Sequence, residues 1–418
     1  MDVIRQAIQL MENNQSDEAI EQLESYIPQA NDEALLNIAE LYMQWGFLEN
    51  AITLLKKLIN KFPEEQSLKI VLAECLIDCE RDEEAIDILH RIDQNDPHYL
   101  QALLQMADLY QAEGLYEVAE MKLLEAKKID VKEPIIDYAL GEFYFSLGDY
   151  SRALLYYEKI VDKEISISKT LLEQRLAESY AAIGHYEKAL SFFSRINSEQ
   201  PEIVFKHGLT AFQADRVDVA IQLWERVIEL DESYTPVYYE LAKVYREMED
   251  WQKVYDISQK GLSVNAYDKK LYVLASQASK QLDKYFESLT LAYEAVHLDP
   301  DYKEAVLLLA EILFDLEAYE LVIEKITKAK ENGAMDPMYD WKLAEAYVEM
   351  ESYEKAARAY ENAYHGLANN PKFLKEYGFF LLEEGEINKA SHVLKDYLNY
   401  EPSDIEVIEH LERLSGGM

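Results

Sequence analysis

Apolar residues recur along this chain at helical spacing, in stretches separated by short polar breaks. In the segment 135–160 the apolar residues keep that spacing up to Tyr144. A Gly-Asp pair at 148–149 then interrupts it. The same spacing resumes at Ala153. The pattern predicts a helix, a short turn and a second helix.

This helix pair returns at a period of about thirty-four residues, and two small residues mark each of twelve copies. The first small position holds Ala7, Ala39, Ala73, Ala107, Gly141, Ala177, Gly208, Ala242, Ser276, Ala310, Ala344 and Gly378. The second, twelve positions later, holds Ala19, Ala51, Ala85, Ala119, Ala153, Ala189, Ala220, Val254, Ser288, Val322, Ala356 and Ala390. Small side chains on both helices let their backbones approach toward the short end of the roughly 8–10 Å packing distance.

Three other positions repeat with the small ones. Tyr or Leu usually stands three residues after the first small position, where it would fill the space beside the helix contact. Seven residues after it, five copies carry glycine: Gly46, Gly114, Gly148, Gly184 and Gly385. Twelve residues after the second small position, five copies carry proline: Pro63, Pro97, Pro201, Pro300 and Pro402. Proline lacks an amide donor, so we expect it to end the second helix.

This pattern resembles the tetratricopeptide repeat, whose unit pairs a small residue and Tyr on one helix with Ala on the next and a closing Pro. The segments IIDYALGEFYFSLGDY and EYGFFLLEEGEINKA further resemble the YpiA-type group of all-repeat proteins from Bacillus relatives. The resemblance implies an all-α fold, a right-handed superhelical solenoid of about twelve helix-turn-helix repeats. We expect one continuous array over residues 1–402, a capping helix over 403–414 with Ser403 as its N-cap, and a frayed tail at 415–418.

Two spacings depart from the period. The second small positions at Ala153 and Ala189 are thirty-six residues apart, and those at Ala189 and Ala220 are thirty-one apart. The segment KEISISK at 163–169 would form the longer loop. The junction at 162–206 is therefore irregular, and either a hinge or a simple change of loop length would explain it.

The charge narrows the choice of partners. Eighty acidic residues against 41 basic ones give a formal net charge of −39, spread along the whole chain. Such a field repels phosphate backbones and anionic lipids, so we expect neither nucleic-acid binding nor membrane insertion. The first residues do not match a secretory signal and no run is long enough to span a bilayer, which favours a cytoplasmic protein.

No catalytic or metal-binding pattern emerges from the sequence. Phosphate-binding glycine loops, dinucleotide fingerprints, paired histidines and nucleophile elbows are all missing from it. Cys75 and Cys79 would share a helix face, but a zinc site needs four ligands, so we interpret them as buried thiols. We expect no enzymatic activity and no cofactor.

In proteins with this repeat, the first helices line a groove that binds partner segments. The residue just after the first small position faces it, and five successive copies carry a carboxylate there: Glu40, Glu74, Asp108, Glu142 and Glu178. Neighbouring groove positions in the middle of the chain are aromatic or basic: Tyr138, Phe145, Phe205, Phe212, Tyr239, Lys243, Arg246, Lys270 and Lys280. We hypothesise an acidic groove in the first half and a mixed aromatic and basic groove around Lys243.

The functional prediction is a scaffold or adaptor that binds a protein or peptide in its groove, and the acidic groove positions favour a basic one. The oligomeric state is left open. The carboxylates could instead be the solvated face of an acidic protein. Assembly into a larger complex through the convex face or the ends is an alternative, and mimicry of nucleic acid is a third. The Lys and Asn clamp of co-chaperones is not reproduced, and the first repeat begins at residue 1, unlike peptide pheromone receptors with an N-terminal module.

Overall fold

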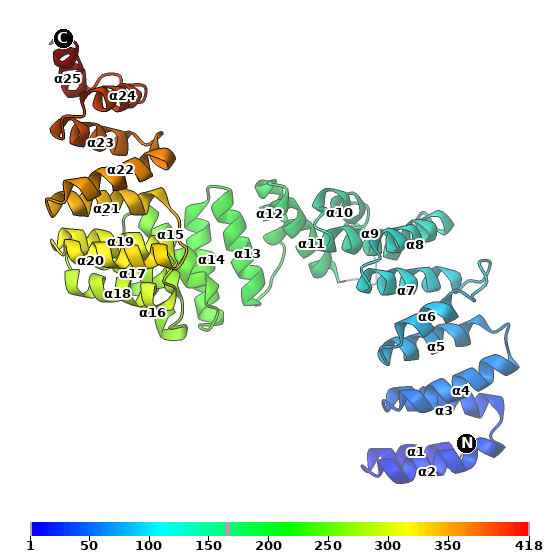
Figure 1. Cartoon of the computed structure of the whole chain (residues 1–418). Helices are drawn as coiled ribbons and strands as arrows, with labels where there is room; N and C mark the ends of the chain where they lie inside the picture. Colours follow the sequence, from blue (N-terminus) through cyan, green and yellow to red (C-terminus); the bar gives the residue numbers. More distant parts are fainter. Residues whose placement is uncertain (1, 164–167, 417–418) are drawn as a thin grey trace. The chain divides into compact units, whose positions relative to one another are not determined.

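The computed structural model describes residues 2–163 and 168–416 (Figure 1). Within these ranges the chain forms twenty-five α-helices and one short 3-10 helix, and the described residues contain no β-strand. The predicted all-α repeat fold is confirmed. The chain divides into two compact units, Met1–Asn197 and Ser198–Met418.

Unit 1 contains six helix pairs, in which the odd-numbered helix is the first of each pair. Its helices are α1 (Asp2–Glu12), α2 (Ser16–Tyr26), η1 (Ile27–Gln29), α3 (Asp32–Gln44), α4 (Leu48–Lys61), α5 (Gln66–Asp78), α6 (Asp82–Leu89), α7 (Tyr99–Ala112), α8 (Tyr116–Ile129), α9 (Pro134–Ser146), α10 (Tyr150–Tyr157), α11 (Lys169–Ala182) and α12 (Tyr186–Phe193).

Unit 2 contains six further pairs and a last single helix. Its helices are α13 (Pro201–Gln213), α14 (Val217–Leu230), α15 (Pro236–Glu247), α16 (Trp251–Val264), α17 (Lys269–Gln281), α18 (Tyr285–Leu298), α19 (Lys303–Asp315), α20 (Tyr319–Glu331), α21 (Pro337–Glu349), α22 (Tyr353–Leu367), α23 (Pro371–Glu383), α24 (Ile387–Leu398) and α25 (Ile405–Gly416).

All twenty-four small positions predicted from the sequence are buried. Where the first position is glycine, a large side chain from the second helix lies directly on it: a Cβ built at Gly141 would come within 2.4 Å of the Tyr157 ring, and one at Gly208 within 2.4 Å of Trp224. Where both positions are serine, at Ser276 and Ser288, each hydroxyl donates to the other residue's carbonyl oxygen at 2.8 Å. The small residues therefore bring the two helices of each pair together.

Each of the twelve pairs turns through a residue with positive φ, seven positions after the first small residue. Five of these residues are the predicted glycines, and seven are Asn14, Glu80, Asp215, Glu249, Asp283, Glu317 and Glu351, with φ between 55° and 60°. Left-handed backbone at this point lets the chain stop the first helix and begin the second. The same turn is thus built with or without glycine.

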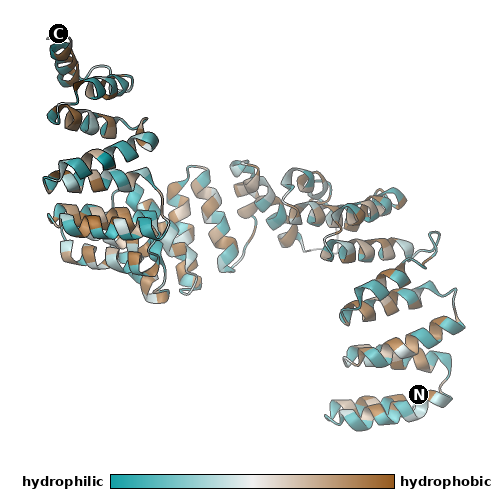
Figure 2. Ribbon diagram, in the orientation of Figure 1, coloured by the Kyte–Doolittle hydropathy of each residue, from teal (hydrophilic) through white to brown (hydrophobic). Residues whose placement is uncertain are grey.

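Successive first helices also contact one another. In unit 2, α15 contacts α17, α17 contacts α19 and α19 contacts α21, while in unit 1 α7 contacts α9. Within each unit, the helices carry hydrophobic and hydrophilic stripes side by side (Figure 2). These first helices therefore lie side by side, and we call the face formed by the first helices of each unit the first-helix surface.

Prolines delimit the helices in two ways. Pro63, Pro300 and Pro402 follow the ends of second helices within four residues, as predicted, whereas Pro97 lies eight residues after α6 ends at Leu89 and does not end it. The expectation for Pro201 was wrong, because α12 has already ended at Phe193 and Pro201 is the first residue of α13. Proline suits that position, where its fixed φ is helical and its missing N–H would have no intrahelical partner.

The last helix begins one residue later than the Ser403 cap implied. Asp404, not Ser403, precedes α25 and accepts a hydrogen bond from the backbone N–H of Val407 at 3.4 Å. The Asp404 carboxylate also binds Lys375 at 2.8 Å and accepts from the Tyr397 hydroxyl at 2.7 Å. One side chain therefore caps α25 and ties it to α23 and α24.

The irregular junction predicted at 162–206 contains the boundary between the two units. Helices α10 and α12 have only eight residues each, which leaves long connections after both. Residues 164–167 of the expected KEISISK loop lie outside the described residues, as do residues 417–418 of the expected tail. Whether the junction is a hinge stays a prediction.

Candidate protein-binding surface

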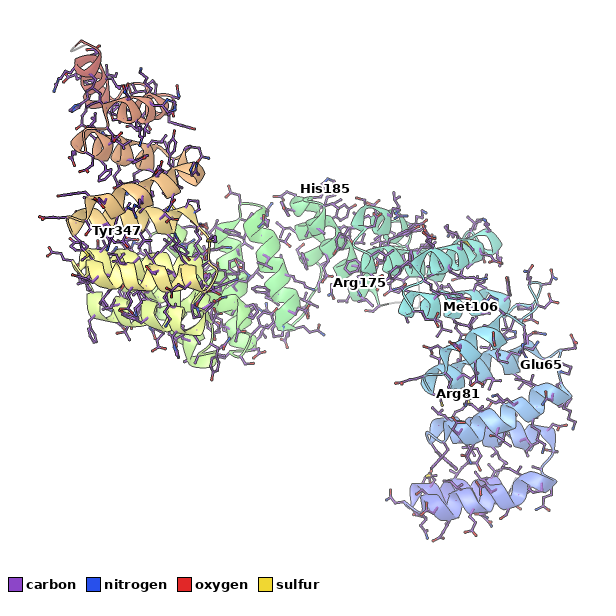
Figure 3. All side chains as sticks on the ribbon, in the orientation of Figure 1. Glu65, Arg81, Met106, Arg175, His185 and Tyr347 are labelled. Atoms are coloured by element: carbon purple, nitrogen blue, oxygen red, sulfur yellow. The ribbon has the colours of Figure 1, made fainter. Side chains whose placement is uncertain are left out.

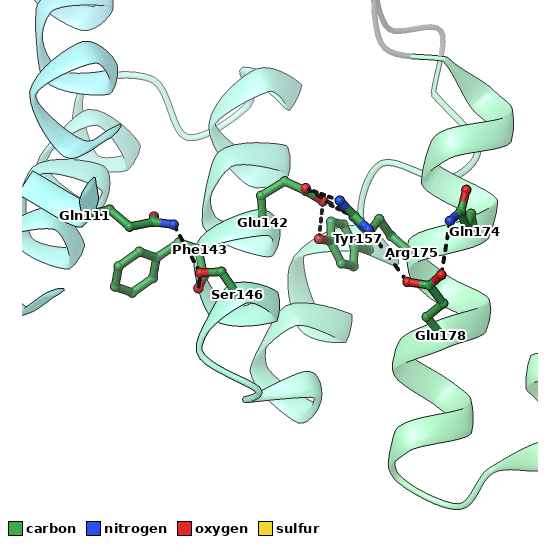
Figure 4. Close-up of polar contacts among 8 residues, drawn as sticks. All are labelled: Gln111, Glu142, Phe143, Ser146, Tyr157, Gln174, Arg175 and Glu178. Atoms are coloured by element: carbon green, nitrogen blue, oxygen red, sulfur yellow. Dashed lines mark hydrogen bonds and ion pairs between the residues drawn. The ribbon is translucent and has the colours of Figure 1, made fainter. Parts of the chain in front are cut away.

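The five carboxylates predicted for the groove of unit 1 all lie on first helices, but they differ in their partners. We call them the carboxylate ladder: Glu40, Glu74, Asp108, Glu142 and Glu178. Glu142 on α9 is held by Arg175 on α11, whose guanidinium donates to both carboxylate oxygens at 2.9–3.1 Å (Figure 4). The Tyr157 hydroxyl also donates to Glu142 at 2.5 Å. Glu142 therefore has its charge balanced inside the protein.

Arg175 organises the rest of this network. Its guanidinium lies 4.5 Å from the centre of the Phe145 ring and 3.6 Å from a carboxylate oxygen of Glu178, while Gln174 donates to Glu178 at 3.0 Å. Tyr138, also predicted for the groove, is half-buried with its ring 6.2 Å from that of Tyr157. The structure thus brings Tyr138, Glu142, Phe145 and Glu178 together around Arg175, which the sequence analysis did not select. Arg175 itself is labelled in Figure 3.

The remaining three carboxylates extend along α3, α5 and α7. Glu74 accepts from the side-chain amides of Gln101 and Gln105 at 3.2 and 3.1 Å. Glu40 and Asp108 are exposed and make no hydrogen bond or ion pair with any other described residue. Although Asp108 reaches solvent, desolvation by the surrounding protein raises the pKa of its carboxyl. Because desolvation disfavours the charged form of Asp108 and no cation among the described residues offsets it, a cation from a partner would stabilise the ionised carboxylate.

A cavity adjoins the N-terminal end of this ladder. It has a volume of about 670 Å³ and lies among α3, the end of α4 and the start of α5. Leu36, on the same face of α3 as Glu40, lines it, and so does Glu65 in the turn before α5. Figure 3 labels Glu65. The sequence analysis missed this cavity because it depends on how the α4–α5 turn folds back over two helices.

In unit 2 the predicted aromatic and basic positions form one cluster. The Lys243 ammonium lies 5.4 Å from the Phe212 ring centre and 6.0 Å from that of Tyr239, and Lys270 lies 5.0 Å from Tyr239. Lys243 is paired with Glu240 at 2.7 Å, whereas Arg246 and Lys270 make no ion pair with the described residues. We call Phe212, Tyr239, Lys243 and Lys270 the aromatic–cation cluster; Arg246 lies three residues after Lys243 on α15.

Lys280 and Phe205 were also predicted for the groove of unit 2, but neither side chain is free to bind a partner. Lys280 is bound by Glu311 at 2.6 Å and Asp315 at 2.7 Å, so its charge is balanced. Phe205 is only 9% exposed and packs against Trp224 and Tyr234. It belongs to the core because Trp224 fills the space above Gly208 and needs an aromatic neighbour.

Sequence reasoning also missed a polar group on α21 and α23. Glu376 accepts from the Trp341 indole at 2.8 Å and from the Tyr360 hydroxyl at 2.7 Å. Desolvation raises the pKa of neighbouring Glu345, although Lys342 binds it at 2.6 Å. Tryptophan at a first-helix position was the available signal, but nothing in the repeat pattern indicates which carboxylate it meets.

The remaining reactive side chains have structural surroundings. Cys75 is buried, and burial raises the pKa of its thiol to about 11, which keeps it protonated and unreactive. Among the described residues, no three or more His, Cys, Asp and Glu side chains are grouped to hold a metal ion. None of the described helices combines the length and apolar character needed to cross a membrane.

Three family descriptions match parts of the chain. The YpiA-like tetratricopeptide repeats match residues 111–165, and the YpiA-like C-terminal tetratricopeptide repeats match residues 337–404. The tetratricopeptide repeat protein 21 ARM repeat matches residues 1–113.

Whole-chain similarity extends further. The chain is 37% identical over 414 residues to the TPR repeat-containing protein YpiA of Bacillus subtilis (strain 168), covering 99% of this chain and 98% of that protein. Among solved structures it is similar to a chain of the APC/C hetero-tetramer Cut9-Hcn1, with 12% identity, a TM-score of 0.43 and coverage of 98% and 95%. Yeast Tom70 is similar with 15% identity, a TM-score of 0.43 and coverage of 100% and 95%. On its repeats and its near full-length relative, the chain belongs to the YpiA-like family of tetratricopeptide-repeat proteins.

Proposed function

We propose that this protein is a non-enzymatic cytoplasmic scaffold whose unit 1 binds a basic segment of a partner protein on its first-helix surface. The observation that carries the proposal is Asp108, which is desolvated enough to have a raised pKa and yet has no cationic partner among the described residues. Glu40 is likewise unpaired and lies on the same surface. The net charge of −39 would speed the approach of a basic partner.

Paired and unpaired carboxylates have different parts in this proposal. Glu142 and Glu178 shape the surface through Arg175, whereas Glu40 and Asp108 are the groups that meet the partner's cations. A single exposed ion pair contributes only about 0–1 kcal/mol, so the two carboxylates set orientation and association rate. Apolar contacts must supply the rest of the affinity.

The direct test is a pull-down in which the intact protein is immobilised and the proteins that it binds from the cytosol of the source organism are identified. We expect the variant E40Q/D108N to lose its principal partner, while a matched variant, E83Q/E117Q, retains it. Glu83 and Glu117 are exposed on the second helices α6 and α8, so both variants change the net charge equally. Equal retention by the two variants would contradict the proposal.

Binding should also depend on pH. Protonation removes the charge of Asp108, and its raised pKa means that this happens at a higher pH than for an ordinary aspartate. We therefore expect affinity to fall on acidification, starting above the range of an unperturbed carboxyl. In D108N this part of the pH dependence should be missing.

One observation favours a second candidate function, assembly through the opposite side of unit 1. Met121 on α8 is 63% exposed and Leu155 on α10 is 59% exposed, both on second helices. If assembly uses this side, M121K/L155K should release the partner that E40Q/D108N retains. The two variants thus distinguish the two functions.

A further inference from the structure

The cavity beside α3 has the size and lining of an anchor pocket. Its volume of about 670 Å³ falls within the roughly 300–1,000 Å³ of typical ligand sites. Leu36, Leu58 and Leu68 form an apolar floor, and Phe62 supplies an aromatic wall that is 40% exposed. A partner's apolar side chain placed against these leucines would remove the exposed face of Phe62 and its own surface from water.

The rim of this pocket is acidic. Asp32, Glu33, Glu64 and Glu65 all line it, against the single cation Lys61. Lys61 is already engaged, since its ammonium binds Asp32 at 2.6 Å and lies 5.4 Å from the centre of the Phe62 ring. Glu33 and Glu64 are exposed and make no ion pair with the described residues. The rim therefore offers negative charge to whatever enters the floor.

We propose that this pocket binds one large apolar side chain of a partner-protein segment that carries Lys or Arg on both sides of it. The inference rests on the proposed function, because it places the apolar contact of the same basic segment. Charge complementarity decides the occupant: the floor accepts an apolar group, and the rim accepts only cations beside it.

The geometry of α3 sets the spacing between the apolar anchor and the cations of the partner segment. Glu33, Leu36 and Glu40 lie three and four residues apart, so they share one face of α3. With a rise of about 1.5 Å per residue, Glu40 lies ~6 Å along the axis from Leu36 and Glu33 ~4.5 Å in the other direction. An extended segment advances roughly 3.3 Å per residue, so its cations should stand one or two residues from the apolar anchor.

The probe is a fluorescein-labelled peptide with a central tryptophan, lysine two residues away on each side, and serine elsewhere. Two matched peptides replace the tryptophan with serine or both lysines with glutamate. Fluorescence anisotropy with the intact protein measures binding at low and high salt. We expect saturable binding of the first peptide, at least ten-fold weaker binding of each matched peptide, and weaker binding at high salt.

Variants locate the binding. Ser67 lines the pocket on α5 and is half-buried, so S67W should fill it and weaken the probe at least ten-fold. F62A removes only a partly exposed wall and should weaken the probe several-fold, which covers the case in which S67W fails to fold. The reversal E33K/E64K should also weaken it about ten-fold, whereas E83K/E117K changes the net charge equally on α6 and α8 and should leave it within two-fold.

Three results would overturn the inference: no saturable binding by the unmodified protein, equal binding of the tryptophan and serine peptides, or unchanged binding by both S67W and F62A. If those two variants bind the probe normally but E40Q/D108N does not, the basic segment binds the first-helix surface without the pocket. The proposed function then stands and only the anchor pocket is wrong. Thermal unfolding by circular dichroism checks that each variant is folded.

Discussion

At the scale of residues, glycine at the first small position leaves room for the side chain sixteen positions later. Gly141 meets Tyr157, Gly208 meets Trp224 and Gly378 meets Leu394, each within 2.6 Å of a built Cβ. Residue type alone does not decide between glycine and alanine, since a buried leucine also stands sixteen positions after Ala107, and a buried tyrosine after Ala344. What requires glycine at these three positions is the close approach of the partner side chain.

This pairing predicts a non-additive pair of substitutions. G141A should lower the free energy of unfolding by about 1–3 kcal/mol, because the new methyl group overlaps the Tyr157 ring. Adding Y157L, which reproduces the Ala107–Leu123 combination, should recover part of that loss. A double-mutant cycle by urea denaturation measures the coupling, and additive effects would refute the pairing.

The small positions could be predicted from the sequence because they depend only on the distance between two neighbouring helices. Side-chain pairing could not. Glu142 and Asp108 occupy the same place in the repeat, yet one is bound by Arg175 and the other has no partner among the described residues. The difference comes from residue 175, which lies one repeat further on and has no fixed identity in the pattern. The same holds for Glu376, whose partner Trp341 lies thirty-five residues away.

At the scale of elements, the turn inside each helix pair combines a fixed backbone with a variable side chain. All twelve turns use positive φ, although seven of them are built without glycine. The sequence analysis identified only the five glycine turns, because the other seven turn residues are Glu, Asp or Asn, which mark left-handed backbone far less clearly than glycine does. Holding such a residue there costs about 1 kcal/mol relative to glycine.

Replacing one of these residues should therefore stabilise the protein. Glu317 joins α19 to α20 with φ of 57°, and E317G should raise the free energy of unfolding of unit 2 by about 0.5–1 kcal/mol. The matched variant E324G introduces glycine at an exposed position inside α20, where it should lower stability by about the same amount. Urea denaturation of both variants should give shifts of opposite sign, and shifts of the same sign would contradict the argument.

The attachment of α25 should depend on acidity. Lys375, Tyr397 and the backbone N–H of Val407 lower the pKa of Asp404 to about 2. Because the folded-state pKa lies below the unfolded value of about 3.9, the stabilisation is complete above that value and is lost as the pH falls toward 2. D404N lacks this contribution. Hydrogen exchange in α25 should be faster in D404N than in the unmodified protein at pH 7, and the difference should shrink below pH 4.

At the scale of the whole molecule, the repeat pattern predicted the family, the helix pairs and an irregular junction at 162–206, but not a division into two units. Twelve similar copies suggest one uniform array, while the structure has two compact units whose boundary in the sequence lies within 162–206. The spacing of thirty-six followed by thirty-one residues was the signal in the sequence. A repeat pattern records how one helix pair is built and carries little information on cooperativity between distant pairs.

Each unit has its own buried cluster, one reaching from Ile4 to Ala189 and the other from Val273 to Val407. In a stacked array, contacts are made between neighbouring repeats, so stability is close to a sum of local terms. We therefore predict that the fragments 1–197 and 198–418 each fold when produced alone. Circular dichroism should give helical spectra and a cooperative unfolding transition for both.

If the proposed function is correct, fragment 1–197 should bind the basic probe peptide with an affinity within a few-fold of the intact protein, and fragment 198–418 should not. Binding that requires both fragments would show that the partner site is not contained in unit 1.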